Sequence, residues 1–478
     1  MSDSKLKIAF IVSEVEDIIK TGGLADVAKA LPLAYEALGH EVCIVMPAYQ
    51  VVIDQFNLTQ HGEFTSSMRQ FKRYEHDLGN VKVHLIGHTC FDREGLYAEN
   101  NVAYSDNGER FGLFSAAVID VLQAVSFQPD IMHCNDWHTG LVPFFVKHNQ
   151  QQFAEGFFAN TKTALTIHNA AFQGSFELHE IPMMQPYHQA LHFDQHPHIN
   201  MMKIGIAHAD KITAVSPTYA QEILTDLGGH GLHYVLQNRS SDLKGILNGC
   251  DYSQWNPTTD PFIPAHFDIN DLSGKAKCKA ALQAKAGFTD SPDTPLIGMV
   301  CRLTAQKGFD YIVPILRDLM AHNLGLVIVG TGDPLVCQQL ADVSRMHPTK
   351  FKFIHGFEPE LAHLVEAGSD FFLMPSEFEP CGLNQMYSLA YATLPIVRNV
   401  GGLSDTVVGI DQNPQEATGF VFDSPSPEAL LICIRRALLL YREQPDLFTT
   451  MQKRAMETKF TWSDAAIQFE ALFQRALH

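Results

Sequence analysis

Short, almost uninterrupted apolar runs recur along the first half of the chain, and helical stretches separate them. The first run is Lys7–Val12, and the following stretch Leu24–Leu38 has apolar residues at helical spacing. Further runs lie at Glu41–Met46, Val81–Ile86, Ile131–His133 and Ala164–Ile167. Continuous apolar runs are typical of strands buried on both faces. Their alternation with helices predicts a doubly wound parallel sheet.

The same alternation begins again in the second half of the chain. Its apolar runs are Leu296–Val300, Gly325–Val329, Phe351–Ile354 and Phe371–Met374. The Gly-, Asn- and Pro-containing stretch Gly245–Pro264 is the best linker candidate. A chain of 478 residues is also too long for one ordinary core. We therefore expect two α/β domains, and the amphipathic helix Trp462–His478 could belong to either.

Composition narrows the possible partners. A hydrophobic content of 46% with 18% charged residues describes a soluble globular protein. The formal net charge of −19 argues against nucleic acid, which would be repelled at long range. A small anionic substrate remains possible, because a few basic side chains in a cleft can make the local electrostatic potential positive.

Cysteine usage and the N-terminus predict a cytoplasmic protein. The nine cysteines include no CxxC pair, and their number is odd, which indicates reduced thiols. The N-terminus has no basic segment followed by a long apolar stretch. No apolar run approaches the roughly 20 residues that span a bilayer, so we expect no membrane association.

A Gly-Gly pair follows the first predicted strand, within Lys20–Val27. Adjacent glycines let the backbone approach a ligand, and the next helix presents unpaired amides to an anion. An isolated Gly-Gly is more often only a tight turn, and this segment is neither GxGxxG nor a Walker A loop. The pattern Gly-Gly-Leu-x-Asp recurs at 401–405, which leaves two alternatives open: shared architectural use in two related halves, or coincidence.

Two loops in the second half carry candidate chemistry at strand ends. Arg302 and Lys307 follow the run Leu296–Val300, where open α/β sheets bind ligands, and an arginine with a lysine suits a diphosphate. Glu379 lies in a Pro-stiffened turn after Phe371–Met374 and could accept hydrogen bonds from sugar hydroxyls. The alternatives are solvated basic side chains for the first loop and a helix-capping glutamate for the second.

The segment His133–His138 resembles a metal site only at first sight. Zinc requires three or four ligands at recognisable spacing, and no second cluster lies nearby in the sequence. Asp136 and Trp137 more plausibly face a sugar, and His168 with Asn169 ends the next strand as a donor–acceptor pair. The chain also contains no DxD triplet, the usual device that holds a metal-bound sugar diphosphate. We expect neither a metal nor another cofactor.

Together these segments resemble the bacterial glycogen synthase and plant starch synthase family over essentially the whole chain. The matching motifs are KTGGLADV (20–27), PDIMHCNDWHTGLVP (129–143), LTIHNAAFQG (165–174), NMMKIGIAHADKITAVSPTYA (200–220), GILNGCDYSQWNP (245–257), RLTAQKG (302–308), VGTGD (329–333), FEPCGL (378–383) and VGGLSDTV (400–407). Each motif is weak alone, but their joint order and spacing are highly specific.

The resemblance implies a GT-B fold, in which two Rossmann-like domains face each other across a deep cleft. It implies an N-terminal, acceptor-side domain at 1–246, a donor-binding domain at 247–457, and a helix at 458–478 that packs back on the first domain. The implied reaction transfers glucose from ADP-glucose to the nonreducing end of an α-1,4-glucan such as glycogen, with retention of configuration and release of ADP.

The resemblance also assigns residues. The implied catalytic residues are His168, Arg302, Lys307 and Glu379. The implied substrate-binding residues are Lys20, Gly22, Gly23, Asp26, Asp136, Asn169, Asn248, Phe357, Cys381, Gly382 and Leu383. Phe357 matches an aromatic that stacks on the base, and Asn248 matches an Asn-Gly turn between the domains.

The chain departs from the family pattern at three positions, and rival functions remain. Glu377 stands where many relatives carry arginine, Cys301 stands where serine is common, and Asn384 lies at a variable position. The charge of Glu377 could weaken donor binding or alter base preference. One rival is a same-fold transferase that uses UDP-glucose or another acceptor. Another rival is a glucan-binding scaffold with an idle site.

Overall fold

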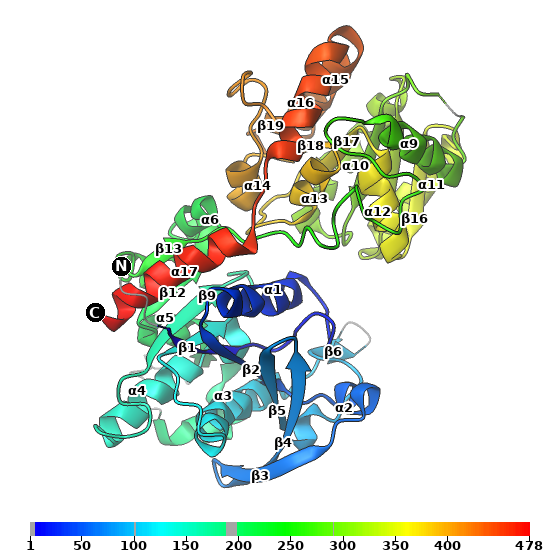
Figure 1. Ribbon diagram of the computed structural model, residues 1–478. Helices are drawn as coiled ribbons and strands as arrows, with labels where there is room; N and C mark the ends of the chain where they lie inside the picture. Colours follow the sequence, from blue (N-terminus) through cyan, green and yellow to red (C-terminus); the bar gives the residue numbers. More distant parts are fainter. Residues whose placement is uncertain (1–4, 100–101, 188–197, 290) are drawn as a thin grey trace. The chain divides into compact units, whose positions relative to one another are not determined.

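The computed structural model describes residues 5–99, 102–187, 198–289 and 291–478. It divides into two compact units, each with its own sheet, which is mainly parallel in unit 1 and fully parallel in unit 2 (Figure 1). Unit 1 comprises Met1–Gly249 and Trp462–His478, and unit 2 comprises Cys250–Thr461. Among the described residues, no helix is long and apolar enough to cross a membrane.

Unit 1 is built on a nine-stranded sheet. In spatial order the strands are β13 (Leu243–Gly245), β12 (Lys211–Ala214), β9 (Lys162–Ile167), β8 (Ile131–Asn135), β1 (Lys7–Ile11), β2 (Glu41–Pro47), β5 (Val81–Gly87), β4 (Arg69–Leu78) and β3 (Gln60–Ser66). The strands from β13 to β5 are parallel, as the apolar runs predict.

The edge of this sheet differs from the prediction, because β4 and β3 pair antiparallel. β3 alternates exposed positions with half-buried or buried ones from His61 to Ser66, and β4 buries only Phe71, Tyr74 and Leu78, so this hairpin is largely solvated. Their polar sequence contains no apolar run, and for that reason the run-based prediction omits them. Two small antiparallel pairs complete the strands: β6 (Ala98–Glu99) with β7 (Val102–Ala103), and β10 (Ser175–Glu177) with β11 (His198–Asn200).

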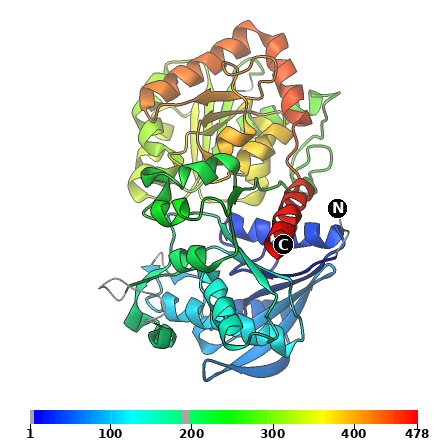
Figure 2. The same cartoon turned by 90° about the vertical axis from the view of Figure 1, so that its left-hand side faces the viewer.

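The C-terminal helix α17 (Trp462–Leu477) packs against α1 (Gly23–Ala37), and both views show the two helices side by side (Figures 1 and 2). The ring centroid of Tyr35 in α1 lies 6.1 Å from that of Phe469 and 5.8 Å from that of Phe473, both in α17. His133 of β8 lies in the same cluster, 4.9 Å from the Phe469 ring. Burial lowers the pKa of His133 to about 3, so this histidine is a neutral core residue.

The other helices of unit 1 connect its strands. They are α2 (Gln50–Phe56), α3 (Asn107–Ala124), α4 (Val142–Gln152), α5 (Met201–His208), α6 (Pro217–Glu222), α7 (Asp226–Gly229), α8 (His233–Gln237) and the 3-10 turns η1 (Thr89–Phe91), η2 (Trp137–Thr139), η3 (Leu178–Glu180) and η4 (Pro182–Tyr187).

Unit 2 has a six-stranded, fully parallel sheet. Its spatial order is β16 (Phe351–His355), β15 (Gly325–Gly330), β14 (Leu296–Val300), β17 (Phe371–Met374), β18 (Leu394–Arg398) and β19 (Phe420–Phe422). From β14 the chain adds β15 and β16 on one side, and it then crosses over to add β17, β18 and β19 on the other side. The order in which strands are added therefore reverses between β14 and β17. Such a switch point is where open α/β sheets bind ligands.

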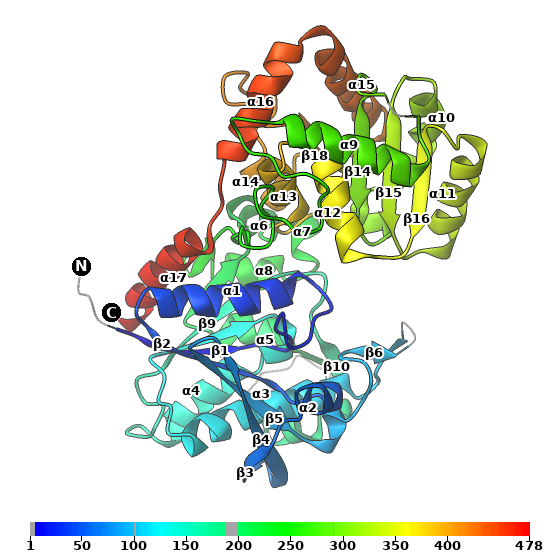
Figure 3. The same ribbon diagram turned by 45° about the vertical axis from the view of Figure 1, so that its right-hand side comes forward.

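Helices cover both faces of this second sheet (Figure 3). One core joins the sheet to α10 (Phe309–Met320), α15 (Pro427–Glu443) and α16 (Pro445–Glu457). The other joins it to α9 (Ser273–Ala286), α12 (Pro359–Gly368) and α14 (Gly401–Thr406). The remaining elements are η5 (Ala305–Lys307), α11 (Pro334–Met346) and α13 (Asn384–Ala390). With a core on each face, the sheet rigidly supports the loops at its carboxyl edge.

Candidate functional site

The candidate residues of unit 1 gather on loops that leave the carboxyl edge of its sheet. The Lys20–Gly23 loop follows β1, Asp136 follows β8, and His168 with Asn169 follows β9. These three strands are neighbours in the order β9-β8-β1. Asn248 follows β13 at the end of the sheet, where its backbone amide donates to the Val215 carbonyl at 3.3 Å. The sheet therefore brings the unit 1 candidates to one edge.

Asp136 connects two of the loops at this edge, the one after β8 and the one after β9. Its Oδ1 accepts a hydrogen bond from the backbone amide of His168 at 2.8 Å and from that of Asn169 at 3.4 Å. His168 Nε2 lies 2.9 Å from Asn135 Oδ1. The Asp136 backbone has φ of 57°, a strained value for a non-glycine residue, which is typical of residues held for a function. Asp136 thus fixes where the loop after β9 presents His168.

Burial shifts the pKa values of both groups. Desolvation raises the pKa of Asp136 to about 7, although the His168 and Asn169 amides oppose the shift. The negative charge of Glu14 raises it further. Burial lowers the pKa of His168 to about 3, so its imidazole is neutral at physiological pH. A neutral imidazole can donate or accept a hydrogen bond at a sugar hydroxyl, but it does not act as a cation.

Lys20 is already paired within its own loop. Its Nζ lies 2.9 Å from Glu16 Oε1 and 2.6 Å from Asp26 Oδ1. Thr21, Gly22 and Gly23 are exposed, and Gly22 is the N-cap of α1, without a side-chain cap. A Cβ added at Gly22 would meet no atom within 4 Å. The local fold therefore does not require glycine at this position.

The candidates of unit 2 lie at the edge formed by β14 and β17. Lys307 Nζ donates to Glu379 Oε2 at 2.6 Å, and Ser376 Oγ donates to the same oxygen at 2.9 Å. Glu379 is 6% exposed, whereas Arg302 is exposed at the same edge. The structure thus brings Lys307 and Glu379 together from segments 72 residues apart, and Arg302 lies exposed on the loop that carries Lys307.

Glycines allow the loops around Glu379 to pack backbone against backbone. A Cβ at Gly308 would lie 2.0 Å from the Pro375 carbonyl oxygen, and one at Gly401 would lie 2.0 Å from that of Glu379. A Cβ at Gly402 would lie 2.1 Å from the Cys381 oxygen, and the Gly402 amide donates to the Glu379 carbonyl at 3.0 Å. Larger residues would displace the Glu379 turn.

The other unit 2 candidates border the same edge. Cys381 is buried at 6% exposure, and Gly382, with φ of 73°, and Leu383 lead into α13. Phe357 lies just before α12 and is 65% exposed, so its ring is accessible to a ligand. Across the described ranges, no three His, Cys, Asp or Glu side chains are grouped so that they could hold a metal ion.

The chain is similar to known proteins over essentially its whole length. Residues 7–238 match the starch synthase catalytic domain, and residues 284–454 match glycosyl transferases group 1. A glycogen synthase of Photobacterium profundum is 50% identical over 481 residues, covering 97% of this chain and 93% of that protein. The chain belongs to the glycogen synthase and starch synthase family.

Further relatives extend the same match. A glycogen synthase of Aeromonas salmonicida is 48% identical, covering 100% of this chain and 99% of its own. The solved catalytic domain of starch synthase IV from Arabidopsis thaliana, bound to ADP and acarbose, has a TM-score of 0.88 and 30% identity, covering 99% of this chain and 100% of that one. The two α/β units thus form the GT-B fold of this family of glycosyltransferases.

The family departure at Glu377 has a local partner in the structure. Arg398, the last residue of β18, has its Nη1 3.6 Å from Glu377 Oε2. The same guanidinium donates to the backbone carbonyls of Ser376, at 3.2 Å, and of Glu377. Asn384, another of the three departures, donates from Nδ2 to the Val300 carbonyl at 2.8 Å and joins α13 to the end of β14. The extra negative charge of Glu377 is therefore balanced by Arg398 at the end of the neighbouring strand β18.

Four residues at these edges escape the sequence interpretation. Glu14 and Thr21 contact each other beside Lys20, Ser376 contacts Glu379, and Arg398 holds the turn before it. Thr21 lies inside the motif KTGGLADV without an assigned role, and the other three residues lie outside the matching motifs. Only their position in the sequence could have revealed them as site residues. Glu14 lies just after β1 and Arg398 ends β18, so both are at the carboxyl edge of a sheet.

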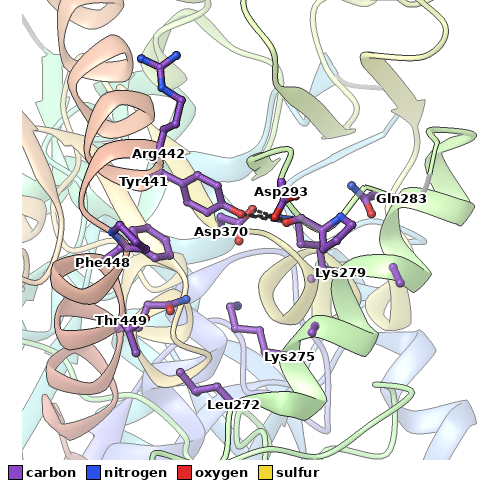
Figure 4. A pocket seen from close by; sticks show the side chains of 16 residues that line it. Leu272, Lys275, Lys279, Gln283, Asp293, Asp370, Tyr441, Arg442, Phe448 and Thr449 are labelled. Atoms are coloured by element: carbon purple, nitrogen blue, oxygen red, sulfur yellow. Dashed lines mark hydrogen bonds and ion pairs between the residues drawn. The ribbon is translucent and has the colours of Figure 1, made fainter.

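A separate cavity of about 580 Å³ in unit 2 lies between α9 and the α15–α16 pair (Figure 4). Lys279 Nζ donates to Asp370 and to the Tyr441 hydroxyl, at 2.7 and 2.9 Å, and to one backbone carbonyl. Lys275 Nζ donates to Thr393 Oγ1 at 2.7 Å and to two backbone carbonyls. The ammonium protons of both lysines are therefore committed to the fold.

Proposed function

We propose that this enzyme transfers glucose from ADP-glucose to the nonreducing end of an α-1,4-glucan such as glycogen, with retention of configuration and without a metal or another cofactor. The observation that carries the proposal is the 2.6 Å contact of Lys307 with Glu379, in which Lys307 comes from the loop that also carries the exposed Arg302. The ligands bound to the Arabidopsis relative, ADP and the oligosaccharide analogue acarbose, support the same two substrate classes.

In this proposal unit 2 stabilises the leaving group. Arg302 chelates oxygens of the diphosphate, and Lys307 supplies a compact charge where negative charge grows as ADP departs. Glu379 holds Lys307 in place through the 2.6 Å contact and accepts a hydrogen bond from a sugar hydroxyl. Phe357 stacks on the base, and the loop Cys381–Leu383 borders the sugar.

Unit 1 supplies the residues at the reacting sugar and the acceptor. His168 and Asn169 bind sugar hydroxyls, and Asp136 fixes both through their backbone amides. Lys20 and the Gly22–Gly23 turn contact the donor. The acceptor 4-hydroxyl attacks the oxocarbenium-like glucosyl group from the face that ADP leaves, and the departing diphosphate accepts its proton.

The proposal includes a cytoplasmic location. Its support is that all nine cysteines are free thiols, six of them buried, in a chain that the sequence places in a reducing compartment.

The test is radiolabelled transfer with product analysis. The purified enzyme, ADP-[14C]glucose and glycogen are incubated with and without EDTA, and the polymer is digested with β-amylase, which cleaves α-1,4 bonds from nonreducing ends. The proposal predicts EDTA-insensitive incorporation and release of the label as maltose. Label that resists digestion contradicts the assigned linkage or configuration. Tight ADP-glucose binding without incorporation instead indicates a glucan-binding scaffold with an idle site.

A further inference from the structure

Glu14 is a buried carboxylate next to an exposed loop. It lies shortly after the end of β1 and is 3% exposed, whereas Thr21, Gly22 and Gly23 are exposed. Its Oε2 accepts a hydrogen bond from the Thr21 backbone amide at 2.5 Å and another from Thr21 Oγ1 at 2.8 Å. Glu14 thus holds the Lys20–Gly23 loop through Thr21, a residue in the middle of that loop.

The segment that carries Glu14 is itself fixed from the opposite side. The Tyr49 hydroxyl donates to the Ser13 carbonyl at 2.9 Å, and the Tyr97 and Ser13 hydroxyls lie 2.7 Å apart. Tyr49 is fully buried. Glu14 therefore connects the exposed side of the turn, around Thr21, to a rigid part of the core.

Holding a carboxylate at such a site is costly. Burial raises the pKa of Glu14, while the Thr21 donors and the Gly22 amide lower it. A helix start that needed only a cap could use serine or threonine at the N-cap, but position 22 is glycine without a side-chain cap. The chain instead stabilises the loop from outside the helix and leaves its exposed face open.

We propose that Glu14 is a positioning residue for glucosyl transfer: its carboxylate holds the Lys20–Gly23 loop through Thr21, so that the loop is set for the donor before the donor binds. The inference rests on the proposed function. It explains why Gly22 has open space around it, because the fixed loop keeps its exposed face free for the substrate. Preorganisation of this kind acts mainly on the transition state and hence on kcat.

The test compares two substitutions at Thr21 in the full-length enzyme. Thr21→Val keeps the volume and the backbone donor but removes the hydroxyl that donates to Glu14, while Thr21→Ser keeps the hydroxyl. We expect the valine variant to lose about fivefold in kcat and the serine variant to stay within about twofold of the wild type. Both variants keep the hydrogen bond from the Thr21 backbone amide to Glu14, so we expect their unfolding temperatures to stay close to that of the wild type.

Glu14→Ala extends the test, with Glu36→Ala, a carboxylate further along α1, as the matched control. Glu14→Ala should lower kcat by at least about tenfold, and the control should leave it unchanged. If Glu14→Ala does not fold, the Thr21 pair still decides. Wild-type kcat in Thr21→Val, or equal losses in the valine and serine variants, would overturn the positioning role. Failure of the wild-type enzyme to use ADP-glucose would contradict the proposed function instead.

Discussion

The two Gly-Gly-Leu-x-Asp segments share four residues of a five-residue pattern but meet different physical requirements. In unit 2, an added Cβ at Gly401 or Gly402 would lie 2.0 or 2.1 Å from a carbonyl oxygen of the Glu379–Cys381 turn. In unit 1, a Cβ at Gly22 would meet nothing within 4 Å, and Glu14 holds the turn through Thr21. Glycine is thus required by packing in unit 2, whereas in unit 1 its use points to a ligand.

The largest expected effect tests the unit 2 side of this comparison. Lys307→Ala removes the cation beside the leaving diphosphate and leaves the buried Glu379 carboxylate without its ion pair. We predict a loss of about 10²–10³-fold in kcat, as for other groups that stabilise transition-state charge. Steady-state kinetics with ADP-glucose and glycogen measure it, and near-normal turnover would exclude Lys307 from the diphosphate clamp.

Gly402→Ala tests whether packing fixes the second segment. The added Cβ has no room beside Cys381, so either the turn or α14 must shift. We predict that the free energy of unfolding falls by about 2–4 kcal/mol, and that activity falls with it. Chemical denaturation followed by circular dichroism gives the stability. An unchanged transition would show that this turn tolerates the shift.

Gly22→Ala, at the first glycine of the pair, is the test in unit 1 and should separate stability from activity. The backbone there is extended, with φ of −158°, which alanine adopts easily. We predict a change in the free energy of unfolding within about 1 kcal/mol, as for other N-cap changes from glycine, but a loss of about tenfold in kcat/KM. Equal losses of stability in Gly22→Ala and Gly402→Ala would remove the distinction between the two segments.

The sequence predicts the buried frame of both units better than their edges and loops. Lys7–Val12 and Leu296–Val300 are recognisable because strands buried on both faces are apolar at every position. β3 and β4 are half-exposed and polar, and β19 has only three residues, so none produces such a run. The motif residues at strand ends also follow from sequence, since parallel strands deliver them to one edge.

The contacts between loops do not follow from sequence in the same way. Glu14 lies in the acidic run SEVED, which suggests a solvated turn, and only the fold shows that this carboxylate is buried against Thr21. Likewise, the charge of Glu377 suggests repulsion of the donor, until Arg398 is placed beside it by the pairing of β17 with β18. Partners distant in sequence are set by register and loop packing, which no single motif encodes.

The pH dependence of activity sharpens the account of unit 1. With its pKa near 7, Asp136 is ionised above that pH and protonated below it. The ionised carboxylate accepts hydrogen bonds from the backbone amides of His168 and Asn169, and protonation weakens them. We therefore expect kcat/KM to fall by up to about tenfold per pH unit below pH 7. Asp136→Asn should have lower activity without this acid limb. An acid limb that persists in the asparagine variant would assign the titration to another group.

The smallest effect is expected at Glu377. Its carboxylate is exposed and 3.6 Å from Arg398, and surface ion pairs contribute at most about 1 kcal/mol. Glu377→Gln should therefore change kcat/KM by less than about threefold, because Arg398 still holds the Ser376 and Glu377 carbonyls. Arg398→Ala, measured beside it, should have the larger effect. The reverse order would place Glu377 itself in donor recognition.

Donor preference is the most direct test of the central claim, glucosyl transfer from ADP-glucose to a glucan. The measurement is kcat/KM for ADP-glucose and for UDP-glucose, with glycogen as acceptor and the same preparation of wild-type enzyme. The account predicts efficient transfer from ADP-glucose and a kcat/KM at least about tenfold lower for UDP-glucose, a discrimination of about 1.4 kcal/mol. A preference for UDP-glucose, or no incorporation from either donor, would contradict it.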